Sequence, residues 1–509
     1  MGVPLGAVLA GCGIFGSDPR DAAAGFLAAL ARGDASAAGQ LTTDPVPATE
    51  VIRQVRDGMR PQQLQLTLGD VRSGDHVASA SFAAVWDLGR GRLWRYQGDF
   101  ELVPADSAEH WLVRWSPAVL HPRLGPQQRL ALRELPAESA PVVDRDGTAL
   151  LSPAGSDQNF APLLVPGIRK VVEQQLSDAA GWRVVTVTPT GRELETLASQ
   201  QPREVPALTA TIDRSVQSAG QHAVDAVSTP AMIVAIQPST GEILGVAENS
   251  AAAVQGPLAL TGRYPPGATF KIVTAVAALE ARQATPDSPV ACPASAVIGE
   301  RVVANDGSLD LGTVPLHTAF AQACDTSFAQ LGARLGTAAL TEAAHQMGIG
   351  MNYDIAGIST ITGQVPPSES MVRRAENGFG LGRVFASPFG MALVASTVAT
   401  GGRLPTPTLI REIPTHTVLG PVASMPGETA AAVRAMMREA VTQGTAQALA
   451  DQGQLYGKTG TVPGSDSVAQ SWFVGFRGDL AFATLVSGTS SPDPALGVTR
   501  SLLSALGSA

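Results

Sequence analysis

The residue that first suggests chemistry is Lys271, in the stretch RYPPGATFKIVTAVAALE between Arg263 and Glu280. No other charged residue lies between these two ends, and the apolar run after the Pro-Pro-Gly turn predicts a helix. A lysine three residues after a serine lies on the same helical face and can accept the proton of the hydroxyl during acyl transfer. In this chain the residue at the serine position is Ala268.

Two further segments place polar residues in apolar surroundings. The first, AFAQACDTSFAQLG at 319–332, contains the methyl group of Ala323 and the carboxylate of Asp325. The second, GKTGTV at 457–462, precedes two more apolar runs and therefore indicates a strand near the end of the chain. It supplies four candidate site residues: Lys458, Thr459, Gly460 and Thr461.

In their order and spacing, these three segments resemble the S-x-x-K, S-x-N and K-T-G motifs of penicillin-binding proteins and serine β-lactamases. The surroundings narrow the resemblance to class B penicillin-binding proteins, whose pattern at the first motif is Y-P-P-G-S-T-F-K. This chain matches that pattern at 264–267 and at 269–271. The resemblance covers about residues 206–509 and implies a domain with an antiparallel sheet flanked by helices.

The pattern of apolar runs agrees with such a sheet. Strands are predicted at 232–236 and 242–246, on either side of a Pro-Ser-Thr-Gly turn. Three more are predicted in GKTGTV, SWFVGF and LAFATLV near the C-terminus, with Ala-rich helices between the two groups. Strands from both ends of the region then share one sheet, and the predicted fold class is α+β in a multidomain chain.

The resemblance also implies a role for each motif. In the family, the first serine attacks a peptide carbonyl with the lysine as its base, and the second motif relays protons and holds the substrate amide. The third motif aligns the substrate as an added strand, and its lysine and hydroxyls hold a carboxylate. The implied ligand is therefore a peptidoglycan stem peptide or a β-lactam.

This chain departs from the family at three motif positions. Ala268 stands in place of the nucleophile, Ala323 in place of the second serine, and Asp325 in place of the asparagine. Neither Thr269 nor Ser327 substitutes easily, because a step of two residues turns a helix by roughly 200°. A carboxylate at position 325 favours the protonated form of the two motif lysines and removes the neutral base. Loss of the nucleophile costs several powers of ten in rate, so we expect negligible covalent turnover.

Two functional interpretations follow from these departures. In the first, the chain is a non-catalytic homologue in peptidoglycan biosynthesis that binds wall peptide or proteins of cell-wall synthesis and division. In the second, it is an active D,D-transpeptidase or carboxypeptidase in which Ala268 is an engineered substitution or another residue is the nucleophile. A β-lactamase or a penicillin-sensing receptor is a weaker third interpretation, because no deacylating glutamate can be assigned.

The first part of the chain is organised differently. The segments WSPAVLHP at 115–122 and DRDG at 144–147 resemble those before the transpeptidase domain in the methicillin-resistance type. That type carries a nuclear-transport-factor-like N-terminal domain, which implies such a domain at 18–116. The segment 117–205 is then a linker and a shortened dimerisation-type domain, followed by the transpeptidase-like domain at 206–509.

Residues 1–17 read as a targeting segment. Leu-Ala-Gly-Cys at 9–12 follows a short apolar run and resembles a bacterial lipobox, in which Cys12 would carry the lipid. This places the chain at the extracytoplasmic face of the cell membrane; the alternative is a small-residue leader with a buried cysteine. The remaining cysteines, Cys292 and Cys324, either pair in an oxidising compartment or stay as buried thiols, and the sequence leaves both open.

The overall composition excludes several other classes. A chain of 509 residues with 45% apolar and 16% charged residues is expected to fold into two to four domains. Its net charge is -9 and it has no basic stripe, so we expect no nucleic-acid partner. Its seven histidines are scattered and no phosphate-binding loop follows a strand, so we expect neither a metal nor a cofactor.

Overall fold

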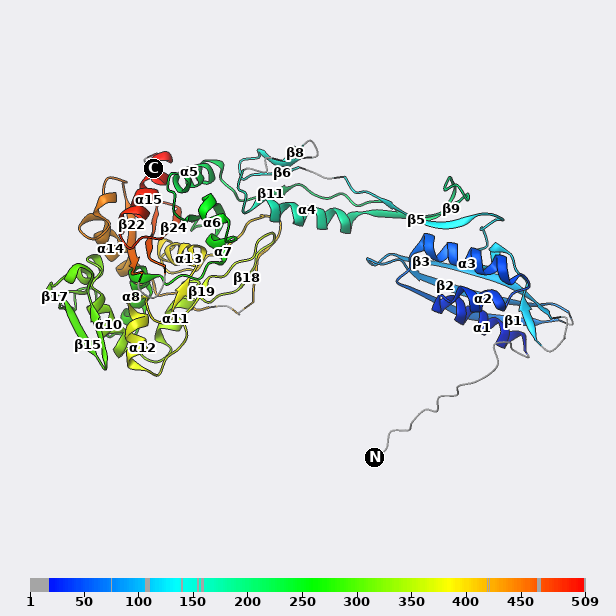
Figure 1. The fold of residues 1–509 in the computed structure, drawn as a ribbon, viewed down its shortest axis with the longest axis horizontal. Helices are drawn as coiled ribbons and strands as arrows, with labels where there is room; N and C mark the ends of the chain where they lie inside the picture. Colours follow the sequence, from blue (N-terminus) through cyan, green and yellow to red (C-terminus); the bar gives the residue numbers. More distant parts are fainter. Residues whose placement is uncertain are drawn as a thin grey trace, which may run out of the picture. The chain divides into compact units, whose positions relative to one another are not determined.

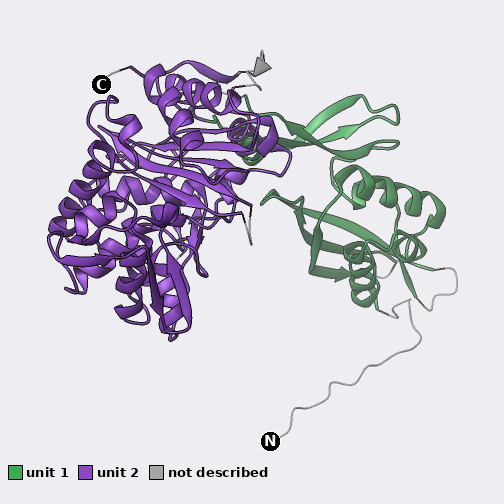
Figure 2. Cartoon of the chain, turned by 60° about the vertical axis from the view of Figure 1, so that its left-hand side comes forward, with its two compact units in different colours: residues 1–138, 174–205 green, residues 139–173, 206–509 purple. Residues whose placement is uncertain are grey.

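The computed structural model describes residues 18–74, 76–105, 110–138, 141–152, 155–156, 160–418, 420, 422–464 and 468–507. Cys12, the predicted lipidation site, lies outside these residues. The chain divides into two compact units, and each is made of two separate stretches (Figure 2). Unit 1 comprises Met1–Glu138 with Gln174–Val205, and unit 2 comprises Ser139–Glu173 with Pro206–Ala509. The segment 117–205 is thus shared between both units.

Unit 1 packs three helices against a four-stranded antiparallel sheet of order β1-β2-β3-β4. The helices are α1 (Pro19–Arg32), α2 (Ala35–Gln40) and α3 (Pro45–Met59). The strands are β1 (Gln63–Ser73), β2 (Ala78–Asp87), β3 (Leu93–Pro104) and β4 (Trp111–Val113). Side chains alternate between buried and outward positions along β2 and β3, so one face of the sheet covers the helices and the other faces outward.

A second sheet of unit 1 has the order β10-β9-β5. It consists of β5 (Arg129–Leu135), β9 (Gly181–Val187) and β10 (Glu193–Gln200). The last two strands come from the returning stretch of the chain, and Trp182 and Val184 of β9 join the same buried apolar cluster as α1 and β2. Residues far apart in the sequence therefore complete one core.

Unit 2 is built on a five-stranded antiparallel sheet of order β13-β12-β24-β23-β22 (Figure 1). Its strands are β12 (Ala231–Ile236), β13 (Ile243–Glu248), β22 (Leu455–Val462), β23 (Gln470–Arg477) and β24 (Leu480–Ser487). The pairing of β12 with β24 joins the two ends of the unit, which confirms the predicted sheet. The prediction for β13 is shifted, since that strand begins at Ile243 and continues to Glu248.

Helices cover both faces of this sheet, which explains why its strands are buried at nearly every position. On one face, Ile233 and Phe473 share a core with α5 (Arg214–Asp225) and α15 (Asp493–Ala505). On the other face lie α8 (Lys271–Glu280), α13 (Pro388–Ala399) and α14 (Gly427–Thr442). Helix α13 is apolar around its whole circumference, as expected for a helix enclosed by protein.

The remaining elements of unit 2 form a helical region and several short hairpins. The helical region consists of α9 (Leu316–Ala321), α10 (Asp325–Arg334), α11 (Ala339–Gln346) and α12 (Met371–Gly378). Two hairpins adjoin it: β14 (Pro289–Cys292) with β17 (Gly312–Pro315), and β15 (Ser295–Ile298) with β16 (Arg301–Ala304). Helix α4 (Val165–Ala179) begins in the first stretch of unit 2 and ends in the second stretch of unit 1. The other short elements are β6 (Val142–Val143), β7 (Ala149–Ser152), β8 (Gly155–Ser156), β11 (Leu208–Thr209), α6 (Ser250–Ala253), α7 (Leu258–Thr261), β18 (Tyr353–Asp354), β19 (Gly363–Gln364), β20 (Phe385–Ala386) and β21 (His416–Thr417). Among the described residues, no helix has the length and apolar content needed to cross a membrane.

Candidate functional site

The predicted motif residues meet at one cavity of unit 2. This cavity has a volume of about 270 Å³ and lies between strand β22 and the start of helix α10. Six of the predicted site residues line it: Ala268, Ala323, Asp325, Thr459, Gly460 and Thr461. The other two, Lys271 and Lys458, lie behind its surface with fully buried side chains. Segments nearly 200 residues apart in the sequence therefore form one site.

Ala268 lies in a short 3₁₀ turn, Gly267–Phe270, and Lys271 is the first residue of the α-helix that follows. Residues three apart eclipse each other in a 3₁₀ turn, so the Ala268 methyl group and the lysine share one side. The backbone around the turn is closely packed. A Cβ atom added to Gly267, which has φ of 53°, would lie 2.5 Å from the carbonyl oxygen of Thr461. Glycine is therefore needed to bring the turn against β22.

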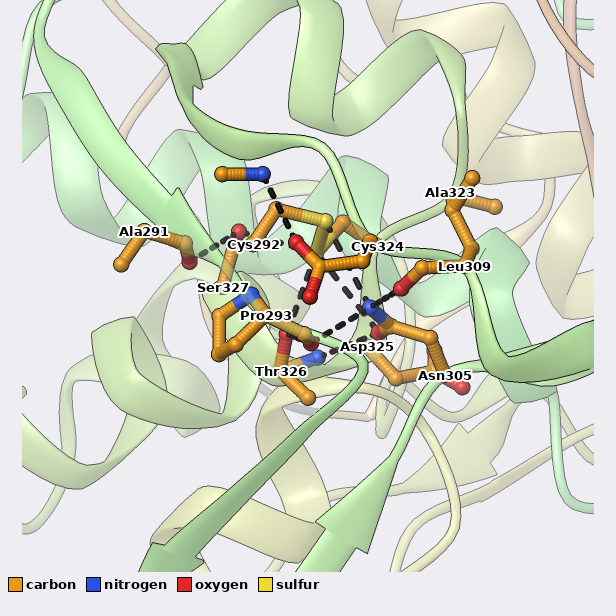
Figure 3. The surroundings of a disulfide bond; sticks show 12 residues. Ala291, Cys292, Pro293, Asn305, Leu309, Ala323, Cys324, Asp325, Thr326 and Ser327 are labelled. Atoms are coloured by element: carbon orange, nitrogen blue, oxygen red, sulfur yellow. Dashed lines mark hydrogen bonds between the residues drawn. A yellow bond between two sulfur atoms is a disulfide. The ribbon is translucent and has the colours of Figure 1, made fainter.

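The hydroxyl groups of Thr269 and Ser327, which follow the first and second motif positions in the sequence, donate hydrogen bonds to backbone oxygens. The Thr269 hydroxyl is buried and donates a hydrogen bond to the Pro266 carbonyl oxygen at 2.6 Å. The Ser327 hydroxyl is also buried and donates to the Ala291 carbonyl oxygen at 2.7 Å (Figure 3). Neither residue lines the cavity, so neither offers a nucleophile in place of the missing serine.

Lys271 is held by the residues that replace the second motif. Its Nζ donates a hydrogen bond to the Ala323 carbonyl oxygen at 3.0 Å and forms an ion pair with the Asp325 carboxylate. Ala323 has φ of 59°, a left-handed conformation that turns the chain just before α10. Burial lowers the pKa of Lys271, and the Asp325 carboxylate opposes this shift. As the ammonium partner of this ion pair, Lys271 has no lone pair with which to accept a proton as a general base.

Lys458 is directed inward as well. Its Nζ donates to the Thr459 carbonyl oxygen at 3.1 Å and contacts the Thr445 hydroxyl at 3.5 Å. The Thr445 and Thr459 hydroxyls are in turn hydrogen-bonded to each other. Burial and the nearby Lys271 lower the pKa of Lys458 well below its ordinary range, although Asp325 opposes the shift. This lysine consequently favours its neutral form more than an exposed lysine does.

A disulfide bond between Cys292 and Cys324 supports the loop that carries Ala323 and Asp325 (Figure 3). It ties strand β14 to the residue before α10, and both cysteines are fully buried. Asn305 adds hydrogen bonds on the same loop, donating to the Pro293 carbonyl oxygen at 2.9 Å and accepting from the Thr326 amide at 2.9 Å. The pairing that the sequence left open is therefore present in the structure.

Several cavity residues were not found by sequence reasoning. Asp306 follows the β15–β16 hairpin, Phe379 and Leu381 follow α12, and Thr445 follows α14. None of them was among the candidate site residues of the three motifs. Only their placement by the tertiary structure brings them to the cavity, so no local pattern identifies them.

Two protein families match the chain. Residues 231–494 match the penicillin binding protein transpeptidase domain, which amounts to more than half of the 509 residues. Residues 18–128 match the NTF2-like N-terminal transpeptidase domain. Both matches agree with the family resemblance that the motifs indicated.

Curated relatives include two proteins named for cell-wall synthesis and sporulation. The peptidoglycan D,D-transpeptidase PbpA of Mycobacterium tuberculosis is 30% identical over 207 residues, covering 35% of this chain and 42% of that protein. Stage V sporulation protein D of Bacillus subtilis is 28% identical over 282 residues, covering 49% of this chain and 43% of that protein. The matched region thus spans less than half the length of these relatives.

Solved structures show the same fold. The crystal structure of PBP2 from Pseudomonas aeruginosa in complex with WCK 5153 has a TM-score of 0.58 at 21% identity, covering 74% of this chain and 96% of that chain. The D,D-transpeptidase domain of a peptidoglycan glycosyltransferase from Eggerthella lenta has a TM-score of 0.53 at 22% identity, covering 73% of this chain and 99% of that chain. The predicted α+β multidomain fold class is confirmed by these similarities.

Proposed function

The chain belongs to the penicillin-binding protein transpeptidase family, and we propose that it is a member that binds cell-wall peptide without bonding covalently to it. The observation that carries this proposal is the side chain at the nucleophile position. Ala268 lines the cavity with a methyl group, directly in front of a lysine that is paired with Asp325. Both the attacking hydroxyl and its free base are absent from that side of the cavity.

The chemistry of acyl transfer explains why this matters. A serine-type transpeptidase needs an oxygen that forms a bond to the peptide carbonyl while a base removes its proton. The neighbouring hydroxyls of Thr269 and Ser327 already donate to backbone oxygens. Because removal of such a nucleophile costs several powers of ten in rate, we expect this member to lack measurable turnover.

The binding side of the cavity supports the other half of the proposal. Strand β22 is at the edge of the five-stranded sheet, and its residues Thr459, Gly460 and Thr461 line the cavity. An edge strand presents backbone donors and acceptors to which an extended peptide can add as a further strand. We therefore assign the peptide-binding role to Lys458–Thr461, with the hydroxyl groups fixing the position of the ligand.

The proposed setting is the outer face of a bacterial membrane. Lipidation of Cys12 would anchor the chain there, and the Cys292–Cys324 disulfide suits an oxidising compartment. We propose that the transpeptidase-like domain at 206–509 presents the cavity to wall peptide or to other proteins of wall synthesis and division. Metabolic labelling with a palmitate analogue tests the anchor, with Cys12→Ala as the unlabelled control.

The experiment that tests the absence of chemistry is labelling with a fluorescent penicillin. The purified chain is incubated with the penicillin, separated on a denaturing gel and analysed by intact mass spectrometry. We expect no covalent adduct on the natural chain. An adduct on any side chain lining the cavity would refute the proposal and favour an active D,D-transpeptidase or carboxypeptidase.

A series of reversions separates the two interpretations further. Ala268→Ser restores only the nucleophile, and the triple variant Ala268→Ser, Ala323→Ser, Asp325→Asn restores the family pattern at all three positions. Acylation of the single variant would mean that position 268 alone blocks activity, as expected for an engineered substitution. Acylation of the triple variant alone would show that the ion pair of Asp325 with Lys271 also blocks the reaction.

A further inference from the structure

The acidic and basic groups around the cavity are separated, with carboxylates on its surface and the side-chain nitrogen atoms of two lysines behind it. From this arrangement we infer that the site binds its peptide through a primary ammonium group of the ligand, and not through a ligand carboxylate. The inference deepens the proposed function and rests on it, because the same cavity is the binding site.

Two carboxylates line the cavity. The side chain of Asp325 is 22% exposed, and its ion pair reaches back to a lysine that is itself inaccessible. Asp306 is exposed at the mouth and forms no ion pair with any residue that the structure describes. Both carboxylates also line an adjoining cavity of about 310 Å³, which extends toward the β15–β16 hairpin. A ligand lying across both cavities therefore passes two anionic groups.

The two lysines of the site are not accessible to the ligand. Lys271 and Lys458 have no exposed side-chain surface, and neither lines either cavity. Their ammonium groups lie over the rings of Phe328 and Phe320, at 5.8 Å and 5.9 Å from the ring centroids. Each is also satisfied by backbone oxygens, Ala323 for Lys271 and Thr459 for Lys458. A ligand carboxylate would find neither of them accessible.

Arg301 does not replace them. It is the one basic residue among the described residues that line the two cavities. Its guanidinium Nε is paired with the Glu376 carboxylate at 3.1 Å, and this pair links the β15–β16 hairpin to α12. Asp325 and Arg301 each have an oppositely charged partner, so the excess of negative charge on the described surface of the two cavities comes from Asp306. Its carboxylate attracts an ammonium group and repels a carboxylate.

The test uses synthetic peptides that differ by one charge. Both end in D-Ala-D-Ala with a C-terminal carboxamide and begin with an acetylated lysine, whose side-chain amine is free in one peptide and acetylated in the other. Binding to the full chain is measured by calorimetry at low and high salt. We expect the free amine to bind about tenfold more tightly at low salt, with most of this preference lost at high salt.

Variants locate the preference at the two carboxylates. Asp306→Asn changes a residue with no ion-pair partner and is expected to reduce the preference for the amine by about threefold. Asp325→Asn is expected to reduce it further, and the thermal midpoint of this variant reports any loss of folding. Asp354→Asn is the matched control, because Asp354 is exposed on β18 and lines neither cavity.

The outcomes distinguish this inference from the function on which it rests. Equal or tighter binding of the acetylated peptide would overturn the inference, as would tighter binding of a third peptide with a free C-terminal carboxylate. Those results would leave the non-covalent binding function standing. Failure of every peptide to bind would overturn both, whereas a covalent penicillin adduct would overturn only the proposed absence of chemistry.

Discussion

The two walls of the cavity differ in what they retain of a transpeptidase site. Strand β22 keeps its threonines and glycine in the order of the family motif and faces the cavity with them. A second wall, which we call the altered wall, is formed by the 3₁₀ turn at Gly267–Phe270 and the loop before α10, and it has methyl groups at Ala268 and Ala323. In the proposed function, the β22 wall holds the peptide and the altered wall presents no group that reacts with it.

The difference shows that shape and reactivity are specified by different residues. The altered wall keeps its backbone path: the Gly267 amide donates to the Gly380 carbonyl oxygen at 3.1 Å, and a Cβ atom on Gly380 would lie 2.1 Å from the Gly267 carbonyl oxygen. These contacts fix the turn whatever side chain follows at position 268. We therefore expect that a change between hydroxyl and methyl at position 268 alters the chemistry of the cavity but not its shape.

The largest effect is expected from the disulfide, which supports the altered wall alone. Replacing Cys292 and Cys324 by alanine releases a loop closed over 32 residues and is expected to lower the free energy of unfolding of unit 2 by about 4 kcal/mol. Hydrogen exchange of unit 2 in urea measures this loss. Cys12→Ala is the control and should leave it unchanged; a loss below about 1 kcal/mol in the double variant would contradict the assignment.

The buried ion pair of the same wall gives the next effect. Lys271→Met leaves the Asp325 carboxylate without its partner and is expected to destabilise unit 2 by about 3 kcal/mol. Adding Asp325→Asn removes the unpaired charge, so the double variant should recover most of the loss. The same hydrogen-exchange experiment measures both, and equal losses in the two variants would show that the pair is not what stabilises this wall.

The third prediction concerns Glu248 on β13, the edge strand opposite β22. Its carboxyl group is buried and forms no ion pair with any residue that the structure describes. Burial raises the pKa of Glu248 to about 7, although the Ala259 amide donates to it and opposes the shift. Because the folded chain binds this proton more tightly than the unfolded chain, the stability contributed by Glu248 is full below about pH 4.5 and is lost as the pH rises through about 7. At about 1.4 kcal/mol for each pKa unit, the expected loss is about 3 kcal/mol.

The pH dependence of the thermal midpoint measures this effect. Glu248→Gln should flatten the decline between about pH 4.5 and about pH 7, since the amide carries no proton that titrates there. Glu428→Gln, an exposed residue at the start of α14, is the matched control and should keep the decline. A decline that persists in the Glu248 variant would assign it to another group.

The smallest effect on stability is expected on the β22 wall. Thr461→Ala removes a hydroxyl that lines the cavity and should change the free energy of unfolding by less than about 0.5 kcal/mol. It should nevertheless weaken peptide binding about fivefold, because a hydrogen bond to the ligand is lost. Calorimetry with the free-amine peptide measures this, and Thr285→Ala, exposed and away from the cavity, is the control. Unchanged affinity would remove Thr461 from the binding wall.

Much of the fold followed from the sequence because the strands of unit 2 are apolar and separated by recognisable turns. The three motifs identified the cavity because each lies in one short segment, such as Lys458–Thr461. The disulfide could not be decided, since its two cysteines are brought together only by the packing of β14 against α10. The inward direction of Lys458 was equally hidden, because it depends on Thr445, 13 residues away in the sequence.

The organisation of the middle segment was also beyond the sequence. Residues 117–205 were predicted to form one linking part with a shortened domain. In the structure, Gln174–Val205 returns to complete unit 1, while Ser139–Glu173 belongs to unit 2. This division of the segment between the two units depends on pairings between strands that are distant in the sequence, such as β5 with β9. Local periodicity does not specify such pairings.

The central claim is that the cavity holds a peptide but does not cleave it. A thioester analogue of a D-alanyl-D-alanine peptide tests this most directly, because acyl transfer of any kind releases a free thiol that can be followed for hours. We predict that release in the presence of the natural chain equals release in buffer alone. Thiol release that rises in proportion to the concentration of the chain, and that disappears in Lys271→Met, would contradict the account.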